Sequence, residues 1–353
     1  MARAGAYYFF LTFFIIYFGM HLYVYLRFQN FFQLAALPFF WAIVILAIAF
    51  PLTSIFERRW ANKFTKVLYY MAAIWFGLLL FLVAILLLRD VLSIFVDIPL
   101  AYSGFLVLFI AIILSLYSMC NAHCLRIKKI KIKISKLSKP IRIVHLSDLH
   151  LGSIREKRFL ARLVNKVNSL QPDFIVITGD IIDGTRKITP KVLSPLKNLH
   201  TAVYFCFGNH EFYYGEKEVM GLLSTTKIKV LRNQKTMQNG IQIVGIDHVE
   251  DLKDNPQLEK TRIDSKKPSI LLIHAPIPAR KIQKMGYDLQ LSGHTHNGQL
   301  FPFNLLARFF YERVTGYHKY KNLHIYISPG TGTWGPPMRF GSKSEITVIE
   351  LKS

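Results

Sequence analysis

The sequence is poor in cysteine, in acidic residues and, over roughly its first 120 positions, in charge of either sign. Its three cysteines are Cys120, Cys124 and Cys206, and their spacing fits neither a disulfide framework nor a thiolate metal site. So few cysteines suit a reducing compartment. The chain also contains no internal repeat and no low-complexity segment.

Acidic residues number 21 against 44 basic ones, which gives a net charge of +23. Residues 1–122 hold seven basic and three acidic residues, so nearly all of the excess lies beyond position 122. Such a basic region suits an anionic membrane leaflet or a phosphate-bearing substrate. Nucleic acid is the competing interpretation, but no nucleic-acid-binding motif accompanies the charge, so we expect no nucleic-acid partner.

The uncharged part of the chain consists of four apolar stretches. Each is close to the roughly 20 residues that a helix needs to cross a bilayer. The first is longer than the apolar core of a signal peptide, and three more follow it. We therefore predict an all-α membrane domain of four transmembrane helices over residues 1–122, with these spans: Ala4–Leu26, Phe31–Phe56, Val67–Leu88 and Leu100–Met119.

These stretches contain almost no ionisable residue, whereas transporters usually keep charged groups inside the bundle. His21 is the main exception, and we interpret it as a helix-packing residue. The bundle is thus expected to be an anchor, which could also hold a lipid. Basic residues gather on the side of the N-terminus, the second loop and the C-terminal region, and only Arg27 and Arg89 lie on the other side. This asymmetry predicts a multi-pass protein with its C-terminal domain in the cytoplasm.

The second domain is expected to span residues 123–353. Its first segment, "LRIKKIKIKISKL", alternates apolar and basic residues, which predicts a strand with one positive face. That strand is either a solvated edge or a contact for anionic lipid headgroups. The amphipathic segment "REKRFLARLVNKVNSL" predicts a helix, and the rest alternates apolar strands with loops in an α/β pattern.

Five of these apolar strands end in polar clusters. In open α/β sheets, sites form in the loops beyond the carboxyl ends of the strands. One such cluster is weak evidence, because an Asp there is more often a turn former, but five in series predict a metal site. Oxygen and nitrogen donors without thiolate suit Mn, Fe or Zn, and seven ligands suit two divalent ions that share a carboxylate. The five strand ends carry, in order, Asp148 and His150, Asp180, Asn209 and His210, His274, and His294 and His296, which is one residue more than the seven candidate ligands.

The clusters "SDLHLG", "GDIID", "GNHE", "IHAP" and "GHTH" together resemble the calcineurin-like metallophosphoesterase superfamily, in its order, over about residues 140–353. The ending "SPGTGTWGPPMRFGSKSEITVIEL" is similar to the bacterial membrane-associated branch, which implies a location in a bacterial inner membrane. The resemblance implies a four-layer α/β sandwich with two facing mixed sheets. It also implies a hydrolase that cleaves a phosphoester or pyrophosphate bond by attack of a hydroxide bridging two metals.

The resemblance also assigns roles to single residues. Asp148, His150 and His296 would hold one ion, and Asn209, His274 and His294 the other. Asp180 would bridge both, and His210 would be a catalytic residue that binds no metal but protonates the leaving group or stabilises the phosphoryl charge.

Further polar residues lie close to these motifs. Asp183 and Glu211 are expected to orient ligand histidines, with a helix cap or a surface carboxylate as the alternative. Five histidines outside the motifs are interpreted as structural or surface residues: His145, His200, His248, His318 and His324.

The last feature is the apolar run "LFPFNLLARFFYERV", which is separated from the "GHTH" motif by the three residues 297–299. It either covers the edge of a sheet or packs in the core, or it forms an amphipathic membrane-dipping segment beside the site, with Arg308 and Arg313 at headgroup level. The inserting residues would be Phe301, Phe303, Leu305, Leu306, Phe309 and Phe310, a set we call the apolar lip.

An anchor, a basic surface and an apolar lip together favour a lipid-linked phosphate, cleaved at the cytoplasmic membrane surface. A soluble nucleotide or phosphoprotein substrate, with the membrane serving only for location, is the alternative within the same chemistry. A membrane sensor or scaffold with residual activity is the alternative of another class.

Overall fold

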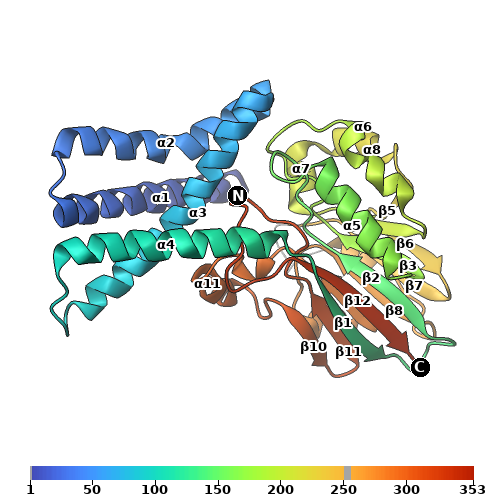
Figure 1. The fold of residues 1–353 in the computed structure, drawn as a ribbon. Coiled ribbons are helices and arrows are strands. Elements are labelled where there is room, and N and C mark those ends of the chain that lie inside the picture. Colours follow the sequence, from blue (N-terminus) through green and yellow to red (C-terminus); the bar gives the residue numbers. More distant parts are fainter. Residues whose placement is uncertain (1, 250–255) are drawn as a thin grey trace. The chain divides into compact units, whose positions relative to one another are not determined.

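The computed structural model describes residues 2–249 and 256–353. The chain divides into two compact units (Figure 1). The first consists of Met1–Cys120 with Gly335–Met338, and the second of Asn121–Trp334 with Arg339–Ser353.

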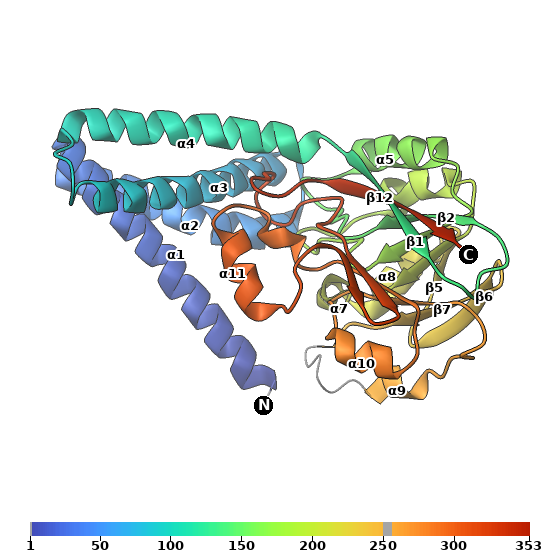
Figure 2. The ribbon, with the colours of Figure 1, turned by 90° about the horizontal axis from the view of Figure 1, so that it is seen from below.

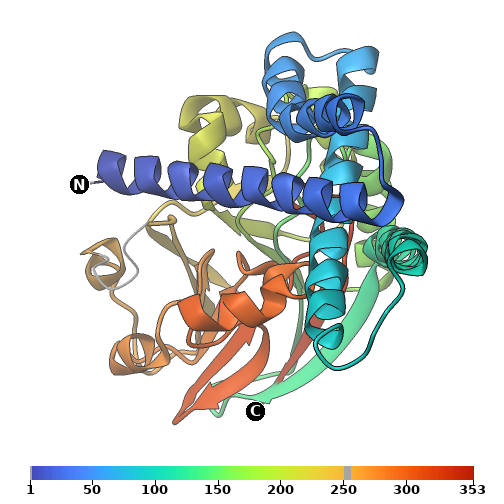
Figure 3. The same ribbon diagram turned by 90° about the vertical axis from the view of Figure 1, so that its left-hand side faces the viewer.

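The first unit is built from four long helices, each with a segment long and apolar enough to cross a membrane. They are α1 (Ala2–Phe32), α2 (Ala36–Trp60), α3 (Lys63–Leu92) and α4 (Leu100–His123), the last turn of α4 belonging to the second unit. α1 packs on α2 and α3. Figure 3, which views α4 along its axis, shows α1 running across that direction.

The boundary between the first two helices differs from the prediction. α1 continues past Leu26 to Phe32, and α2 begins at Ala36 rather than at Phe31. The chain turns at Gln33, whose φ of 49° is left-handed and interrupts the helix. Because the residues on both sides of Gln33 are equally apolar, hydropathy alone could not locate this turn.

The few polar residues of the helices pair with one another. Trp75 Nε1 donates to His21 Nε2 at 3.0 Å, which suits the interpretation of His21 as a packing residue. The guanidinium of Arg27 lies 2.6 Å from the Asp90 carboxylate. Thr65 donates to Glu57 at 2.6 Å and joins α3 to α2. These polar groups are therefore matched inside the bundle, as an apolar surrounding favours, whereas the buried Tyr17 hydroxyl has no hydrogen-bond partner among the described residues.

The second unit contains two six-stranded sheets, both mixed. In the first sheet the strand order is β1 (Arg126–Lys133), β12 (Glu345–Lys352), β2 (Ile141–Leu146), β3 (Phe174–Thr178), β4 (Val203–Cys206) and β5 (Ile228–Val230). In the second sheet it is β10 (Gly316–Tyr320), β11 (Leu323–Ile327), β9 (Leu289–Ser292), β8 (Ser269–Ile273), β7 (Ile241–Ile246) and β6 (Gln234–Gln238).

Three apolar cores separate four layers. One core lies between the sheets and includes Ile143, Val176 and Leu272. A second lies between the first sheet and helices α5 (Lys157–Ser169), α6 (Pro190–Leu193) and α8 (Glu216–Leu223). A third lies between the second sheet and helices α9 (Pro256–Lys260) and α10 (Ala279–Lys284). Figure 2 shows α5 and α10 on opposite sides of the strands, so the predicted four-layer sandwich is confirmed.

Candidate metal centre

The seven predicted ligands and the predicted catalytic residue His210 all follow strands that run parallel to one another within each sheet. Asp148 and His150 follow β2, and Asp180 follows β3. Asn209 and His210 begin the short helix α7 (Asn209–Tyr214) after β4. In the second sheet, His274 follows β8, while His294 and His296 follow β9. The carboxyl ends of both sets of strands meet, and all eight side chains lie at this one edge.

The imidazoles and carboxylates converge to contact distance. His150 Nε2 lies 3.0 Å from His296 Nε2, and His296 Nε2 lies 3.4 Å from Asp148 Oδ1. His274 Nε2 lies 3.1 Å from both Asp180 Oδ2 and His294 Nδ1. His150 Nε2 lies 3.7 Å from Asp180 Oδ2. Two trios of ligand atoms result, Asp148–His150–His296 and Asp180–His274–His294, and Asp180 also groups with His150 and His210.

Five of these residues are held in the left-handed backbone region, which non-glycine residues seldom adopt. Asp148, His150, Asp180, His294 and His296 have φ values of 54°, 46°, 54°, 71° and 49°. Each such conformation costs of the order of 1 kcal/mol or more and persists only where the surrounding structure imposes it. At these positions the left-handed conformation turns the side chains toward one another.

Two motif glycines explain how the loops come so close. A Cβ at Gly293 would lie 1.9 Å from Ser147 Oγ and 2.3 Å from Asp148 Oδ2. A Cβ at Gly208 would lie 2.2 Å from Asp180 Oδ1. Both distances are far inside van der Waals contact, so only glycine lets these backbones pass beside the carboxylates.

Burial and charge set the protonation of the cluster. Burial lowers the pKa of His274, but the carboxylates of Asp180 and Asp148 outweigh it and raise the pKa to about 10. Burial lowers the pKa of His294 and of His296 well below the usual range, so both imidazoles are neutral. A neutral imidazole is the form that binds a metal.

The donor set fits two divalent ions. The Oδ1 atom of Asn209 is buried and has no hydrogen-bond partner among the described residues. A buried oxygen without a partner is unfavourable, and a bound metal ion would supply that partner. Two pairs of imidazole nitrogens face each other near 3 Å, an arrangement that a cation between them stabilises. The fully buried Asp148 and the almost fully buried Asp180 supply the negative charge. Oxygen and nitrogen donors without thiolate suit Mn, Fe or Zn.

Comparison with known proteins agrees with this arrangement. The profile of a family described as calcineurin-like phosphoesterase matches residues 141–298. A protein of Aquifex aeolicus described as a metallophosphoesterase is 34% identical over 261 residues, which cover 69% of this chain and 98% of the relative.

The chain belongs to the calcineurin-like metallophosphoesterases. A Campylobacter jejuni metallophosphoesterase is 37% identical over 235 residues, or 64% of this chain and 63% of its own. A zebrafish (Danio rerio) transmembrane protein with a metallophosphoesterase domain is 35% identical over 272 residues, or 70% of this chain and 62% of its own. The matches therefore span slightly less than two thirds of the length of these two relatives.

Within the metallophosphoesterase site, Asp183 and Glu211, which we expected to orient ligand histidines, make different contacts. Asp183 Oδ1 lies 3.3 Å from His150 Nδ1 and so can orient that ring. Glu211 accepts from the backbone N–H groups of Gly208, Asp180 and Ile181 at 2.8–2.9 Å, so it fixes two ligand-bearing loops rather than an imidazole. Burial, together with the Asp180 charge, raises the pKa of Glu211 to about 7.

Two residues near the centre were missed by the sequence analysis. His248 was interpreted as a structural or surface residue, and the structure places its ring centroid 5.5 Å from that of His294. It follows β7, a strand whose end carries no family motif. Arg339 is fully buried and donates to the backbone oxygens of Gly332 and His296 at 2.7 and 3.4 Å. A lone arginine in a glycine-rich ending gives no signal of such burial.

The apolar lip does not pack in the core. All of its residues except Phe301 belong to helix α11 (Phe303–Phe310), and no residue of this helix is buried. Phe309 and Phe310 are 84% and 81% exposed. α11 ends beside the centre, since the ring of Tyr311 lies 5.9 Å from that of His294. The core-packing interpretation is therefore wrong, and membrane insertion stays a prediction.

Proposed function

We propose that this chain is a membrane-anchored hydrolase that cleaves a phosphoester or pyrophosphate bond with two divalent metal ions. The convergence of seven oxygen and nitrogen donors at one edge of the two sheets carries the proposal. Family membership supports the same reaction class.

Asp148, His150 and His296 would hold one ion, Asn209, His274 and His294 the other, and Asp180 both. Manganese, iron or zinc would suit this donor set. When bound, the two ions supply charge stabilisation for the phosphoryl oxygens and an activated water at neutral pH. The chain itself fixes the donors, through strained loops and the Glu211 contacts to two of them.

His210 is the group proposed to move a proton. Its ring Nδ1 lies 2.6 Å from the backbone oxygen of Asp183, to which it can donate. The backbone N–H of His210 donates to Asp180 Oδ1 at 3.1 Å. These two bonds leave Nε2 available to protonate the departing oxygen. An imidazole suits this step because it titrates near neutrality.

We take residues 1–122 as the membrane anchor and residues 123–353 as the catalytic domain. Four apolar helices and relatives that carry transmembrane domains support a membrane location. The excess of Lys and Arg near the N-terminus, the second loop and β1 supports a cytoplasmic catalytic domain. Bacterial relatives support an inner-membrane protein of a bacterium.

The substrate is proposed to be a lipid-linked phosphate at the membrane surface. The exposed lip lies beside His294 through Tyr311, so an apolar surface and the candidate centre adjoin. The exposed lysines of β1, an edge strand, provide positive charge for anionic headgroups. A lipid-linked nucleotide diphosphate, a phospholipid and a polyprenyl pyrophosphate would each fit.

One experiment separates the lipid-linked substrate from the two alternatives, a soluble substrate and a sensor or scaffold. Full-length protein in mild detergent with Mn²⁺ is incubated with a total membrane lipid extract, beside His210→Ala, and phosphorus species are followed by mass spectrometry. Loss of a lipid phosphate with the wild type alone would support the proposal. Activity only on a soluble aryl phosphate would favour a nucleotide or phosphoprotein substrate. No activity on either would favour a sensor or scaffold.

A further inference from the structure

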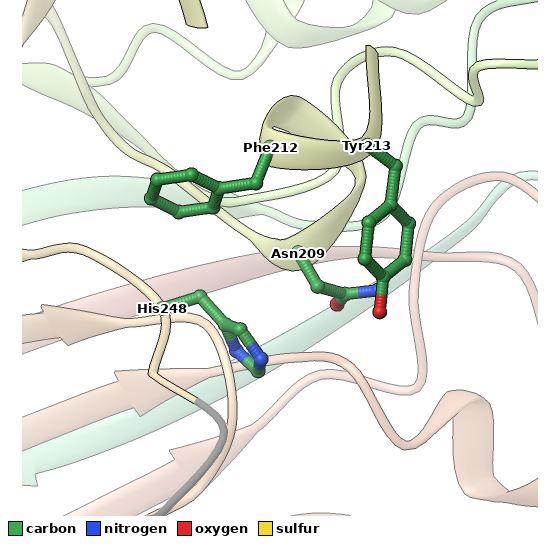
Figure 4. Close-up of a pocket in the computed structure, with 4 residues that line it drawn as sticks. All are labelled: Asn209, Phe212, Tyr213 and His248. Atoms are coloured by element: carbon green, nitrogen blue, oxygen red, sulfur yellow. The ribbon is translucent and has the colours of Figure 1, made fainter. Parts of the chain in front are cut away.

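A small pocket opens beside the proposed metal centre, and of the residues that line it only Asn209, a proposed ligand, has an assigned role. It has a volume of about 120 Å³ and is lined by Asn209, Phe212, Tyr213 and His248. Figure 4 shows Phe212 and Tyr213 projecting from one short helix on either side of Asn209, with the imidazole of His248 coming from a facing loop.

The pocket adjoins both parts of the proposed machinery. The ring centroid of His248 lies 5.5 Å from that of His294, a proposed ligand. The ring centroid of Tyr213 lies 5.5 Å from that of His210, the proposed proton donor. If the phosphate is held at the centre and His210 protonates the leaving-group oxygen, the leaving group therefore lies next to this pocket.

The pocket walls are aromatic rings, and the residues around them hold Phe212 and His248 in place. The ring of Phe212 packs edge-on against Phe207 at 5.7 Å, and the Arg232 guanidinium lies 5.6 Å from its centroid. The backbone N–H of His248 donates to the Phe207 oxygen at 3.1 Å, which ties the facing loop to the same point. Tyr213 is exposed and forms the outer wall. Three rings thus surround a space with one carboxamide at its base.

We propose that this pocket binds a single planar ring carried by the group esterified to the phosphate. The assignment rests on the proposed function, since it places the ring relative to the metal centre. The volume of about 120 Å³ is of the same order as that of an apolar cavity of about 150 Å³ that accommodates benzene, and Tyr213 borders solvent, so a single ring is the largest group expected here. Aromatic walls favour a flat π-system over a puckered ring of the same size, through stacked and edge-on contacts.

The test compares ligands that share a phosphonate and differ in one ring. Benzylphosphonate, cyclohexylmethylphosphonate and methylphosphonate are titrated calorimetrically into Mn²⁺-loaded full-length protein in detergent. We expect benzylphosphonate to bind about fivefold more tightly than its cyclohexyl counterpart, as aromatic pair contacts allow. Tyr213→Leu should bring this ratio close to one and leave the affinity for methylphosphonate unchanged. Tyr317→Leu, at an exposed tyrosine on β10, is the matched control and should keep the ratio.

Two results would overturn the assignment: equal binding of the two ring ligands by the wild type, or an unchanged ratio in Tyr213→Leu. Phe212→Leu, a change in the inner wall, must agree with Tyr213→Leu. Hydrolysis of benzyl phosphate separates this assignment from the proposed function. Tight benzylphosphonate binding without hydrolysis keeps the pocket and removes the phosphoesterase proposal. Hydrolysis without any ring preference does the reverse.

Discussion

His210 differs from the other residues of the centre, because it is proposed to act on the leaving group without holding a metal. Replacing it with alanine should lower kcat by about 10²–10⁴-fold, the range for loss of a general acid. KM and the number of bound Mn²⁺ ions should change little. Steady-state kinetics on an aryl phosphate, with metal analysis of the same samples, measures both. A fall in bound metal would instead make His210 a ligand.

Gly293 shows how close packing defines the centre. Gly293→Ala places a Cβ 2.3 Å from Asp148 Oδ2 and should destabilise the fold by about 1–3 kcal/mol, as overpacking does. Affinity for Mn²⁺ should fall with it. The matched control is Gly221→Ala in α8, where a Cβ meets nothing within 4 Å and the helix should gain up to about 1 kcal/mol. Unfolding in denaturant measures both variants, and similar effects of the two would contradict this explanation.

The residues that the sequence could predict are those in short motifs at strand ends. Asp148 and Asp180 follow neighbouring parallel strands, so their proximity follows from parallel pairing. His274 comes from the other sheet, and its approach depends on how the two sheets stack, which the sequence does not show. His248 follows β7, which is parallel to β8, so strand-end reasoning could have pointed to it, but its loop carries no family motif. The left-handed backbone of Asp148 and His150 was unpredictable, because it is imposed by contacts that form only in the folded chain.

At the scale of elements, helix α11 leaves its large apolar side chains exposed instead of packing them in the core. The double change of Phe309 and Phe310 to Ser should leave the free energy of unfolding nearly unchanged, because both rings are exposed. It should lower kcat/KM on a lipid-linked phosphate in mixed micelles about tenfold, through lost apolar contact. Activity on a soluble aryl phosphate should stay constant.

The control for α11 is Met237→Ser, which removes an exposed apolar side chain from β6. It should affect neither substrate. An equal loss on soluble and lipid substrates in the α11 variant would mean that the lip supports the centre rather than binding lipid.

Element positions followed from the sequence more readily than sheet order. The alternation in Arg126–Lys133 predicted a strand, and the structure has it as edge strand β1. Its neighbour is the last strand, β12, which lies parallel to β1 and antiparallel to β2. Strands more than 200 residues apart give no local signal of pairing, and β12 carries the same apolar pattern as several other strands.

For the whole molecule, orientation in the membrane is the property that the charge distribution predicts. A reporter enzyme that is active only in the cytoplasm, fused after Ser353, should be active, because basic residues flank the helices on that side. A reporter that requires export, fused at the same place, should be silent. The opposite pair of results would place the catalytic domain outside the cytoplasm and exclude a cytoplasmic-surface substrate.

The proposed reaction depends most on two metal ions sharing Asp180. The direct measurement is the number of Mn²⁺ ions bound per chain by purified full-length protein, by equilibrium titration with electron paramagnetic resonance. We expect two ions per chain, with the spin coupling of closely spaced Mn²⁺, and loss of that coupling in Asp180→Asn. One ion per wild-type chain, or two uncoupled ions unaffected by Asp180→Asn, would contradict it.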